Sequence, residues 1–354
     1  MKNNFIIALS VGLAITLGAQ AQALKVSTYT SKDGSIYTGA LLNGKPNGPG
    51  HTLYANGDEY NGNYTKGKRN GEGSLTYKNG EKYEGMWVLD LRNGKGTYSY
   101  ANNNRYEGLW FKDKRHGKGV MYYYNGDKYD GDWQGDKRHG LGKYTYQNGA
   151  YYDGQWRNDI KNGQGIFYWA DGTTYKGNWS NGQRSGQGVN QYSDGDVYSG
   201  LWLNDVPHGK GIYRFSNGDT YEGEYYQGRR TGDGIYRYVN GDLYKGHFSN
   251  GYKDGYGEMH FRNGDIYVGY WKEDLQNGRG KFTTKDGSVL EGNYLNGIPD
   301  GEFEVKESNG AKSRGHYKDG KRQGKFVEID EQGVRTDKLY NNGELVEENG
   351  TPVK

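Results

Sequence analysis

Residues 129–151 read YDGDWQGDKRHGLGKYTYQNGAY, and the same 23-residue pattern recurs from Tyr37 to Arg335 without a change of register. Numbering each repeat from the Tyr of its Tyr-x-Gly, position 12 is glycine in thirteen consecutive repeats. These glycines are Gly48, Gly71, Gly94, Gly117, Gly140, Gly163, Gly186, Gly209, Gly232, Gly255, Gly278, Gly301 and Gly324. A strict period of this length is typical of a repeat array, in which each unit packs only on its neighbours.

The side-chain pattern within each repeat predicts β-structure. Aromatic residues and glycine alternate with a spacing of two along Tyr-x-Gly-x-Trp and again at positions 14, 16 and 18, which is the period of a strand. The chain also holds 62 glycines, each of which would destabilise a helix interior by about 0.5–1 kcal/mol. We therefore expect an all-β fold, an elongated single-layer antiparallel β-meander of tandem hairpins that follows a cleaved N-terminal signal helix.

The repeated glycines and aromatic residues predict how such a sheet is held together. We place a turn near positions 7 to 12 of each repeat, with the position-12 glycine in it, and a second tight turn at the Asn-Gly or Asp-Gly of positions 20 and 21. A single sheet has no second layer. Rings at positions 1, 5, 16 and 18 are therefore expected to lie over bare glycine backbone and to replace a conventional core.

The chain divides into four parts by its pattern. Residues 1–23 are predicted to be a cleaved signal peptide, residues 24–36 an N-terminal half-repeat, residues 37–335 the thirteen repeats, and residues 336–354 a C-terminal half-repeat and tail. The signal prediction rests on Lys2, on an apolar run, and on small residues spaced for cleavage before residue 24. We therefore expect an exported bacterial protein that is periplasmic, on the cell surface or secreted.

Charge is distributed unevenly between the two kinds of turn. Positions 6 to 11 carry more Lys and Arg than Asp and Glu, whereas positions 19 to 23 carry more acidic residues. The basic turns have two interpretations: solvated tips that keep sheets apart, or a strip that binds an anionic membrane or envelope polyanion. The candidate residues for anionic-surface binding are Lys66, Lys68, Arg69, Lys112, Lys114, Arg115, Lys137, Arg138, Arg229 and Arg230. A net charge of only +3 does not favour nucleic acid as a partner.

Motifs for catalysis, cofactors or metals are weak. Gly-x-Gly at positions 12 and 14 lacks the following helix that a phosphate site needs, and the chain has no Cys nucleophile. His116, His139 and His208 share position 11, but adjacent repeats lie about 10 Å apart, too far to share one zinc ion. We predict no catalytic residue, no cofactor and no metal. Two sets of tyrosines could contact sugars or protein, or reflect only sheet propensity. One is the run Tyr122, Tyr123 and Tyr124, of which at least one points to the opposite face, and the other is Tyr168, Tyr226, Tyr252 and Tyr270, outside the main ring positions.

The unit Tyr-x-Gly-x-Trp followed by Gly-x-Gly and a closing Gly resembles the MORN repeat, with Tyr129 to Trp133 and Gly140 to Gly142 as a close instance. The resemblance implies a non-catalytic scaffold that mediates protein contact or self-association, with membrane contact as the alternative. The last two repeats replace Tyr at position 1 and Gly at position 14, and are similar to a variant in bacterial antitoxin-like proteins. Some MORN proteins carry a kinase domain, but residues 336–354 are too few for one, so a kinase or antitoxin name would rest on repeat similarity alone.

Overall fold

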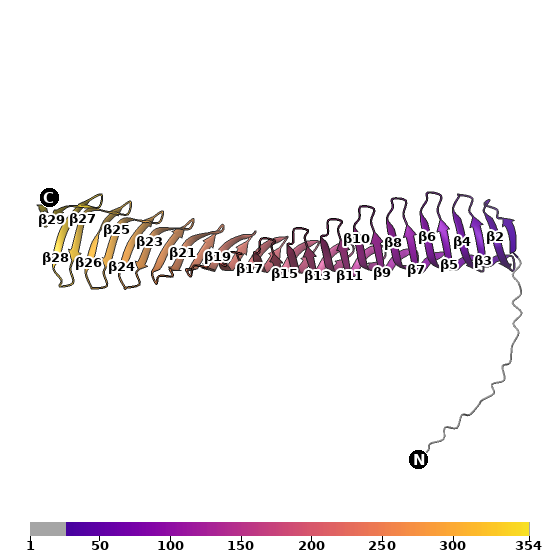
Figure 1. Ribbon diagram of the computed structural model, residues 1–354, viewed down its shortest axis with the longest axis horizontal. Coiled ribbons are helices and arrows are strands. Elements are labelled where there is room, and N and C mark those ends of the chain that lie inside the picture. The colour runs from indigo at the N-terminus through magenta and orange to yellow at the C-terminus, as the bar shows by residue number, and fades with distance from the viewer. Residues whose placement is uncertain (1–25, 354) are drawn as a thin grey trace, which may run out of the picture. The chain divides into compact units, whose positions relative to one another are not determined.

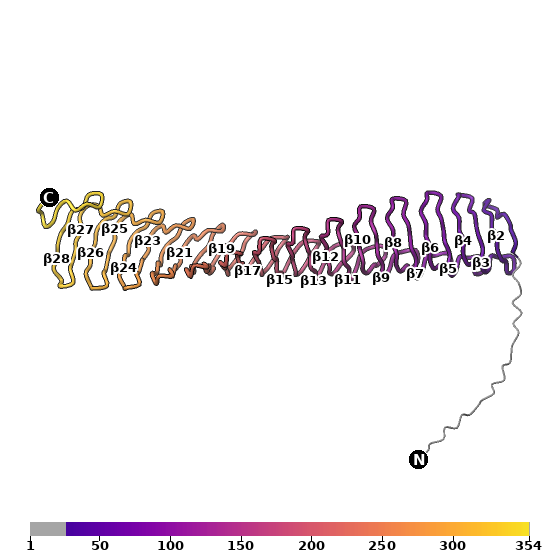
Figure 2. Tube along the Cα trace, in the orientation of Figure 1, coloured from indigo at the N-terminus to yellow at the C-terminus, as the bar shows by residue number. Residues whose placement is uncertain are grey.

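The computed structural model describes residues 26–353 as thirty β-strands without a helix. These residues form two compact parts, 26–114 and 115–353. Within each part, successive strands lie side by side in chain order and pair antiparallel in one layer (Figures 1 and 2). The single-layer meander predicted from the repeat pattern is therefore confirmed within each part, while the expected signal segment, residues 1–23, lies outside the described residues.

The strands follow the repeat throughout. In the N-terminal part they are β1 (Val26–Thr30), β2 (Ile36–Leu42), β3 (Lys45–Leu53), β4 (Glu59–Thr65), β5 (Lys68–Thr76), β6 (Lys82–Val88), β7 (Leu91–Ser99) and β8 (Arg105–Phe111). The C-terminal part holds β9 (Lys114–Tyr122, whose first residue belongs to the N-terminal part), β10 (Lys128–Gln134), β11 (Lys137–Thr145), β12 (Tyr151–Arg157), β13 (Ile160–Tyr168), β14 (Thr174–Ser180), β15 (Gln183–Gln191), β16 (Val197–Leu203), β17 (Val206–Arg214), β18 (Thr220–Tyr226), β19 (Arg229–Arg237), β20 (Leu243–Ser249), β21 (Tyr252–His260), β22 (Ile266–Lys272), β23 (Leu275–Thr283), β24 (Val289–Leu295), β25 (Ile298–Lys306), β26 (Lys312–Lys318), β27 (Lys321–Ile329), β28 (Arg335–Asn341), β29 (Glu344–Glu348) and β30 (Thr351–Pro352).

The turn inside each repeat is shorter than the sequence predicted. Only positions 7 and 8 lie outside the strands, and in most repeats both have positive φ, as at Asn158 (50°) and Asp159 (70°). Two consecutive left-handed residues form the tight hairpin turn whose twist matches that of the flanking strands. The prediction that positions 7 to 12 form the turn was therefore wrong in its extent.

The position-12 glycine lies within the second strand of each hairpin, at a β-bulge. In the β12–β13 pair the register runs from Gly154↔Gly165 to Trp156↔Lys161, so residues 162–164 face Gln155 alone. Gly163, at the centre of the bulge, has φ +96°, which L-residues rarely adopt. The glycine is thus required by the bulge, and the prediction that it marks a turn is corrected.

The turns between repeats agree with the prediction. In the β11–β12 turn the amide of Tyr146 donates to the carbonyl of Ala150 at 2.8 Å, and the amide of Gly149 donates to the carbonyl of Tyr146 at 3.0 Å. The side chain of Asn148 accepts a hydrogen bond from the Ala150 amide at 3.1 Å. An Asn or Asp at position 20 therefore closes the turn, and glycine at position 21 supplies its left-handed residue.

The core is a column of rings on one face of each sheet, which we call the ring face. Tyr152 at position 1 is fully buried, and its hydroxyl donates to the carbonyl of Gln155 at 2.9 Å. An added Cβ at Gly154 or Gly165 would lie 2.4–2.7 Å from this tyrosine or from the facing strand, so both glycines leave space for the ring. Trp156 packs edge-to-face on it at 5.2 Å. The expectation that rings cover glycine backbone is confirmed.

In the last two repeats, the column is formed by a phenylalanine at position 14 in place of the tyrosine at position 1. Position 1 holds Leu290 or Ser313, and position 14 holds Phe303 or Phe326 in place of glycine. Both phenylalanines are 1 % exposed, and Phe303 lies 5.3 Å from Tyr294 in an edge-to-face contact. The ring therefore reaches the column from the neighbouring strand, so the departure from the repeat pattern leaves the packing intact. The C-terminal segment, where a half-repeat and a tail were expected, forms three strands, β28 to β30.

Candidate functional site

A cation at position 10 links each repeat to the next on the ring face. The guanidinium of Arg138 lies 4.3 Å from the ring of Trp156 in the following repeat, and its Nε lies 3.1 Å from a carboxylate oxygen of Asp159. The same side chain donates to the main-chain carbonyl of Asp159 at 3.0 Å. Cation–π contact and a charge-assisted hydrogen bond thus hold one hairpin turn against the next.

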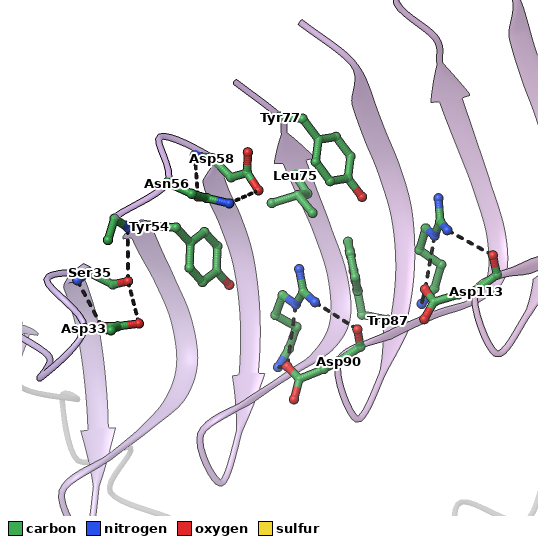
Figure 3. A pocket seen from close by; sticks show the side chains of 13 residues that line it. Asp33, Ser35, Tyr54, Asn56, Asp58, Leu75, Tyr77, Trp87, Asp90 and Asp113 are labelled. Carbon is green, nitrogen blue, oxygen red and sulfur yellow. Dashed lines mark hydrogen bonds and ion pairs between the residues drawn. The ribbon is translucent and has the colours of Figure 1, made fainter. Parts of the chain in front are cut away.

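This arrangement repeats along both parts of the chain. Figure 3 shows Asp90 and Asp113 at successive turns of the N-terminal part, each joined by dashed lines to a guanidinium, that of Arg69 and Arg92 respectively. The ion pairs of this kind are Arg69–Asp90, Arg92–Asp113, Arg115–Asp136, Arg138–Asp159 and Arg184–Asp205. Lys161 and Lys253 occupy the same position and lie 4.3 Å and 4.6 Å from Trp179 and Trp271.

The ten basic residues predicted as an anionic-surface strip fall into two groups. Six of them, at positions 7 and 9, are exposed at the turns: Lys66, Lys68, Lys112, Lys114, Lys137 and Arg229. The other four, at position 10, are half-buried and engaged on the ring face: Arg69, Arg115, Arg138 and Arg230. Only the first group is available to a surface ligand. Strand alternation, which separates positions 9 and 10, was the signal that could have divided them.

Replacing Arg138 by alanine is expected to lower the free energy of unfolding of the adjoining repeats by about 1–3 kcal/mol, because the stacking on Trp156 and the bond to Asp159 are both lost. Lys137, the next residue, is exposed at the turn, so Lys137→Ala serves as the matched control and should change stability by less than about 0.5 kcal/mol. Denaturant unfolding followed by Trp fluorescence measures both. Equal losses in the two variants would contradict the assigned role of Arg138.

A second set of polar contacts holds the turns between repeats. The hydroxyl of Tyr213 donates to the Asp196 carboxylate at 2.6 Å, and the Ser216 amide donates to it at 2.7 Å. These hydrogen bonds lower the pKa of Asp196, whereas burial and the same carboxylate raise the pKa of Tyr213. Tyr98–Glu81, Tyr144–Asp127 and Tyr236–Asp219 are equivalent pairs. These carboxylates are therefore structural acceptors.

The ring face of the N-terminal part has an open hollow of about 640 Å³, shown in Figure 3. Its lining includes Arg69, Trp87 and Asp90, which form one of the links just described, and Asp58, whose carboxylate accepts hydrogen bonds from Asn56 and from the Lys78 amide. These polar groups already bond within the sheet. Ser35 and Asp33 also line it, where the Ser35 hydroxyl donates to the Asp33 carboxylate at 3.1 Å and accepts from the Ala55 amide at 3.2 Å. The hollow is thus a result of how the repeats are joined.

Residues 26–353 show neither a metal cluster nor a spanning helix. No group of three or more His, Asp or Glu side chains in this range could hold a metal ion, and none of its segments forms a helix long and apolar enough to cross a membrane. His208 of the position-11 histidines lies 5.5 Å from the ring of Tyr226. Among the tyrosines outside the main ring positions, Tyr124, Tyr226, Tyr252 and Tyr270 are at least half exposed. Tyr123 lies at ring position 18 and packs on Tyr144 at 5.7 Å.

Comparison with known proteins agrees with this geometry. The family model described as MORN repeat matches eleven consecutive units, residues 37–59, 60–82, 83–105, 106–128, 129–151, 152–174, 175–197, 198–220, 221–243, 244–266 and 267–289. No curated protein matches the chain. The family's repeat is non-catalytic, and in general it forms scaffolds that bind proteins or membrane lipids.

Solved structures give only distant likenesses. The TCP domain of SAS-4 (dCPAP) of Drosophila melanogaster, in complex with a proline-rich motif of Ana2, is 19% identical, with 51% of this chain and 85% of that chain covered and a TM-score of 0.27. The TCP10 domain of Danio rerio CPAP is 13% identical over 69% of this chain and 99% of that chain, with a TM-score of 0.23. These scores carry no argument about function. The eleven matched units, joined hairpin to hairpin by the ring column, make this chain a member of the MORN repeat family.

Proposed function

We propose that the protein is an exported, non-catalytic scaffold whose repeats contact a protein partner or another copy of the chain. The observation that carries this proposal is how the side chains are used. The Arg, Asp and Tyr groups that could perform chemistry are bonded between repeats, whereas apolar side chains are left exposed at the turns. Exposed apolar rows are typical of surfaces that bind other proteins.

Many of the exposed apolar residues lie at positions 6 and 9, which face each other across the turn inside each repeat. In the C-terminal part they form a row over the repeats between β16 and β25. Its members are Leu203, Val206, Tyr252, Leu275, Leu295 and Ile298, all 38–50 % exposed. The pairs Leu203↔Val206 and Leu295↔Ile298 are in register. Val88 and Leu91 form an equivalent exposed pair in the N-terminal part, whereas Ser180 and Gln183 are polar at the same positions, so the fold does not require apolar residues there.

Replacing Leu275, Leu295 and Ile298 by serine is expected to abolish partner retention or self-association while leaving the sheet folded. Each side chain is about half exposed, so the cost to stability is small compared with loss of a buried residue. The control changes Ser180 and Gln183 to alanine. Cross-linking in the native compartment and light scattering on the mature chain give the readouts. Unchanged complexes and an unchanged mass in the serine variant would reject the proposal.

Export rests on the composition of residues 1–23, which carry Lys2 followed by an apolar run and small residues before position 24. Cell fractionation together with N-terminal sequencing of the mature chain tests it. A cytoplasmic chain that still begins at Met1 would remove the exported part of the proposal and leave the binding part standing.

Binding to an anionic membrane or envelope polyanion is the second candidate function, and the six exposed basic residues favour it. Changing Lys66, Lys68, Lys112 and Lys114 to glutamate should weaken binding to anionic vesicles by more than about tenfold, since each Lys near such a surface contributes about 1 kcal/mol. The same four positions changed to arginine provide the control. Binding should also fall as salt rises. Equal sedimentation with neutral vesicles would exclude this function.

A further inference from the structure

The face opposite the rings carries a groove in the C-terminal part that the proposed function does not use. It crosses strands β15 to β22 and has a volume of about 1000 Å³. Its floor is the glycine backbone of positions 3 and 14, where Gly211, Gly223, Gly234, Gly246 and Gly257 pair in one row. The Cβ directions of these glycines point to the ring column, so the floor is bare backbone.

Two rows of side chains form the walls of this groove. Positions 2 and 15 supply one wall, in which Ile212, Glu222, Ile235, Lys245, Glu258 and Val268 follow one another on neighbouring strands. Positions 4 and 13 supply the other wall, with Glu224, Asp233 and Tyr256. Tyr256 is 58 % exposed and packs on Tyr270 at 5.6 Å. Each wall therefore offers apolar surface between charged groups.

Two of the four carboxylates of this groove, Glu222 and Glu224, make no ion pair, unlike several of their equivalents in other repeats. At position 2, Glu84 pairs with Lys82 at 2.8 Å and Glu107 pairs with Arg105 at 2.7 Å. Glu222 occupies the same position, but Thr220 stands where those repeats have a cation. Within residues 26–353, neither Glu222 nor Glu224 makes an ion pair.

The repeat that contains Glu291, Glu302 and Glu304 supplies an internal comparison. Its three carboxylates also lie on the face opposite the rings, yet they pair with Arg279 at 2.8 Å, His316 at 3.4 Å and Arg314 at 3.7 Å respectively. In the groove, His247 reaches Asp233 at 3.4 Å and His260 reaches Glu258 at 2.5 Å, while the Asp233 carboxylate remains 96 % exposed. The groove holds four carboxylates and the two ammonium groups of Lys210 and Lys245. It therefore keeps an uncompensated negative charge beside its apolar walls.

From this charge and shape we infer that the groove binds an extended basic segment of a partner protein in which cationic and apolar side chains alternate. The backbone of the floor is already paired within the sheet, so the segment cannot add as a strand and must be recognised through its side chains. Successive side chains of an extended peptide point to opposite sides. Lys or Arg residues can therefore reach carboxylates on a wall while apolar residues cover Ile212, Ile235 and Tyr256.

This inference rests on the proposed scaffold function and specifies one of its partners. The test uses the mature chain and a short fluorescent peptide of alternating lysine and leucine, followed by anisotropy. The variant Glu222→Gln/Glu224→Gln should weaken binding about tenfold, because two charge contacts are lost. The control Glu302→Gln/Glu304→Gln removes the same charge from the compensated repeat and should leave the affinity within about twofold.

Four results would overturn the inference. Equal losses in the variant and its control would show attraction to the net charge alone, and unchanged affinity in the Glu222/Glu224 variant would show that the groove is not used. A peptide with serine in place of leucine that binds equally well would remove the role of the apolar walls. Self-association that the same variant abolishes, without peptide binding, would assign the groove to a second copy. The row of exposed apolar residues at positions 6 and 9 is tested separately by its serine variants, so failure of the peptide test leaves the scaffold function standing.

Discussion

Replacing Tyr244 by alanine is expected to lower the free energy of unfolding of its region by about 3–5 kcal/mol, the range for deleting a large buried aromatic side chain. Tyr244 is fully buried at position 1 of its repeat. Its hydroxyl donates to the carbonyl of His247 at 3.0 Å, and its ring packs on Phe248 at 5.2 Å and on Trp271 at 5.3 Å. The substitution therefore removes a contact on both sides of the repeat and leaves a cavity over bare glycine.

Hydrogen exchange resolved by strand is the appropriate measurement for Tyr244→Ala, because a repeat array opens locally and its stability is a sum of units and interfaces. Protection should fall most in β20 and β21 and less in distant strands. Tyr226→Ala is the control, since that side chain is 59 % exposed. Comparable loss of protection in the two variants would contradict the role of the ring column as the core.

The ring column could be predicted from the sequence because every contact in it recurs at the repeat period. Tyr at position 1 and glycine at positions 3 and 14 keep the same spacing in eleven repeats, so the pattern itself indicates what packs on what. The Phe303 and Phe326 positions show the limit of such reasoning. They read as degeneration of the repeat, and only the structure shows that these rings enter the same column from the neighbouring strand.

The candidate site was less predictable because its decisive contacts join neighbouring repeats. Arg138 and Asp159 are 21 residues apart, and nothing in the local sequence distinguishes Arg138 from the exposed Lys137 beside it except strand alternation. Counting charges by position therefore placed both the structural cations of position 10 and the exposed cations of positions 7 and 9 in one predicted anion-binding strip.

Because residues that recur in every repeat serve the structure, functional residues must be sought at positions where the repeats differ. Position 10 is cationic in most repeats because it clamps the next hairpin, and position 22 is often acidic because it closes a turn. Glu222 stands out because Thr220 replaces the cation that precedes Glu84 and Glu107, and Leu295 because a polar residue such as Ser180 occupies its position in several other repeats. In this array, binding specificity arises where exposed residues differ from one repeat to the next, while the residues that hold the sheet together stay the same.

The glycine at position 12 belongs to that frame, and substituting it should be costly. Gly255→Val is expected to destabilise the region around β20 to β22 by about 2–4 kcal/mol, through backbone strain and crowding together. Gly255 has φ +105°, a conformation in which a β-branched residue is strained, and an added Cβ would lie 3.2 Å from the Cβ of His247 on the paired strand. With valine at this position, the bulge would either remain in a strained conformation or be lost together with the register of the strand pair.

Gly251→Asp provides the control for Gly255→Val, since it also changes a glycine of positive φ in the same repeat. Gly251 lies at position 8, nothing lies within 4 Å of an added Cβ there, and other repeats carry aspartate at this position, as at Asp274. Strand-resolved hydrogen exchange should show marked loss of protection for Gly255→Val and little for Gly251→Asp. If both glycines tolerated substitution equally, the conservation of position 12 across thirteen repeats within this chain would need a cause other than the bulge. If the valine variant alone loses protection, the bulge explains the glycine at position 12, because the same two-residue register shift recurs in every hairpin.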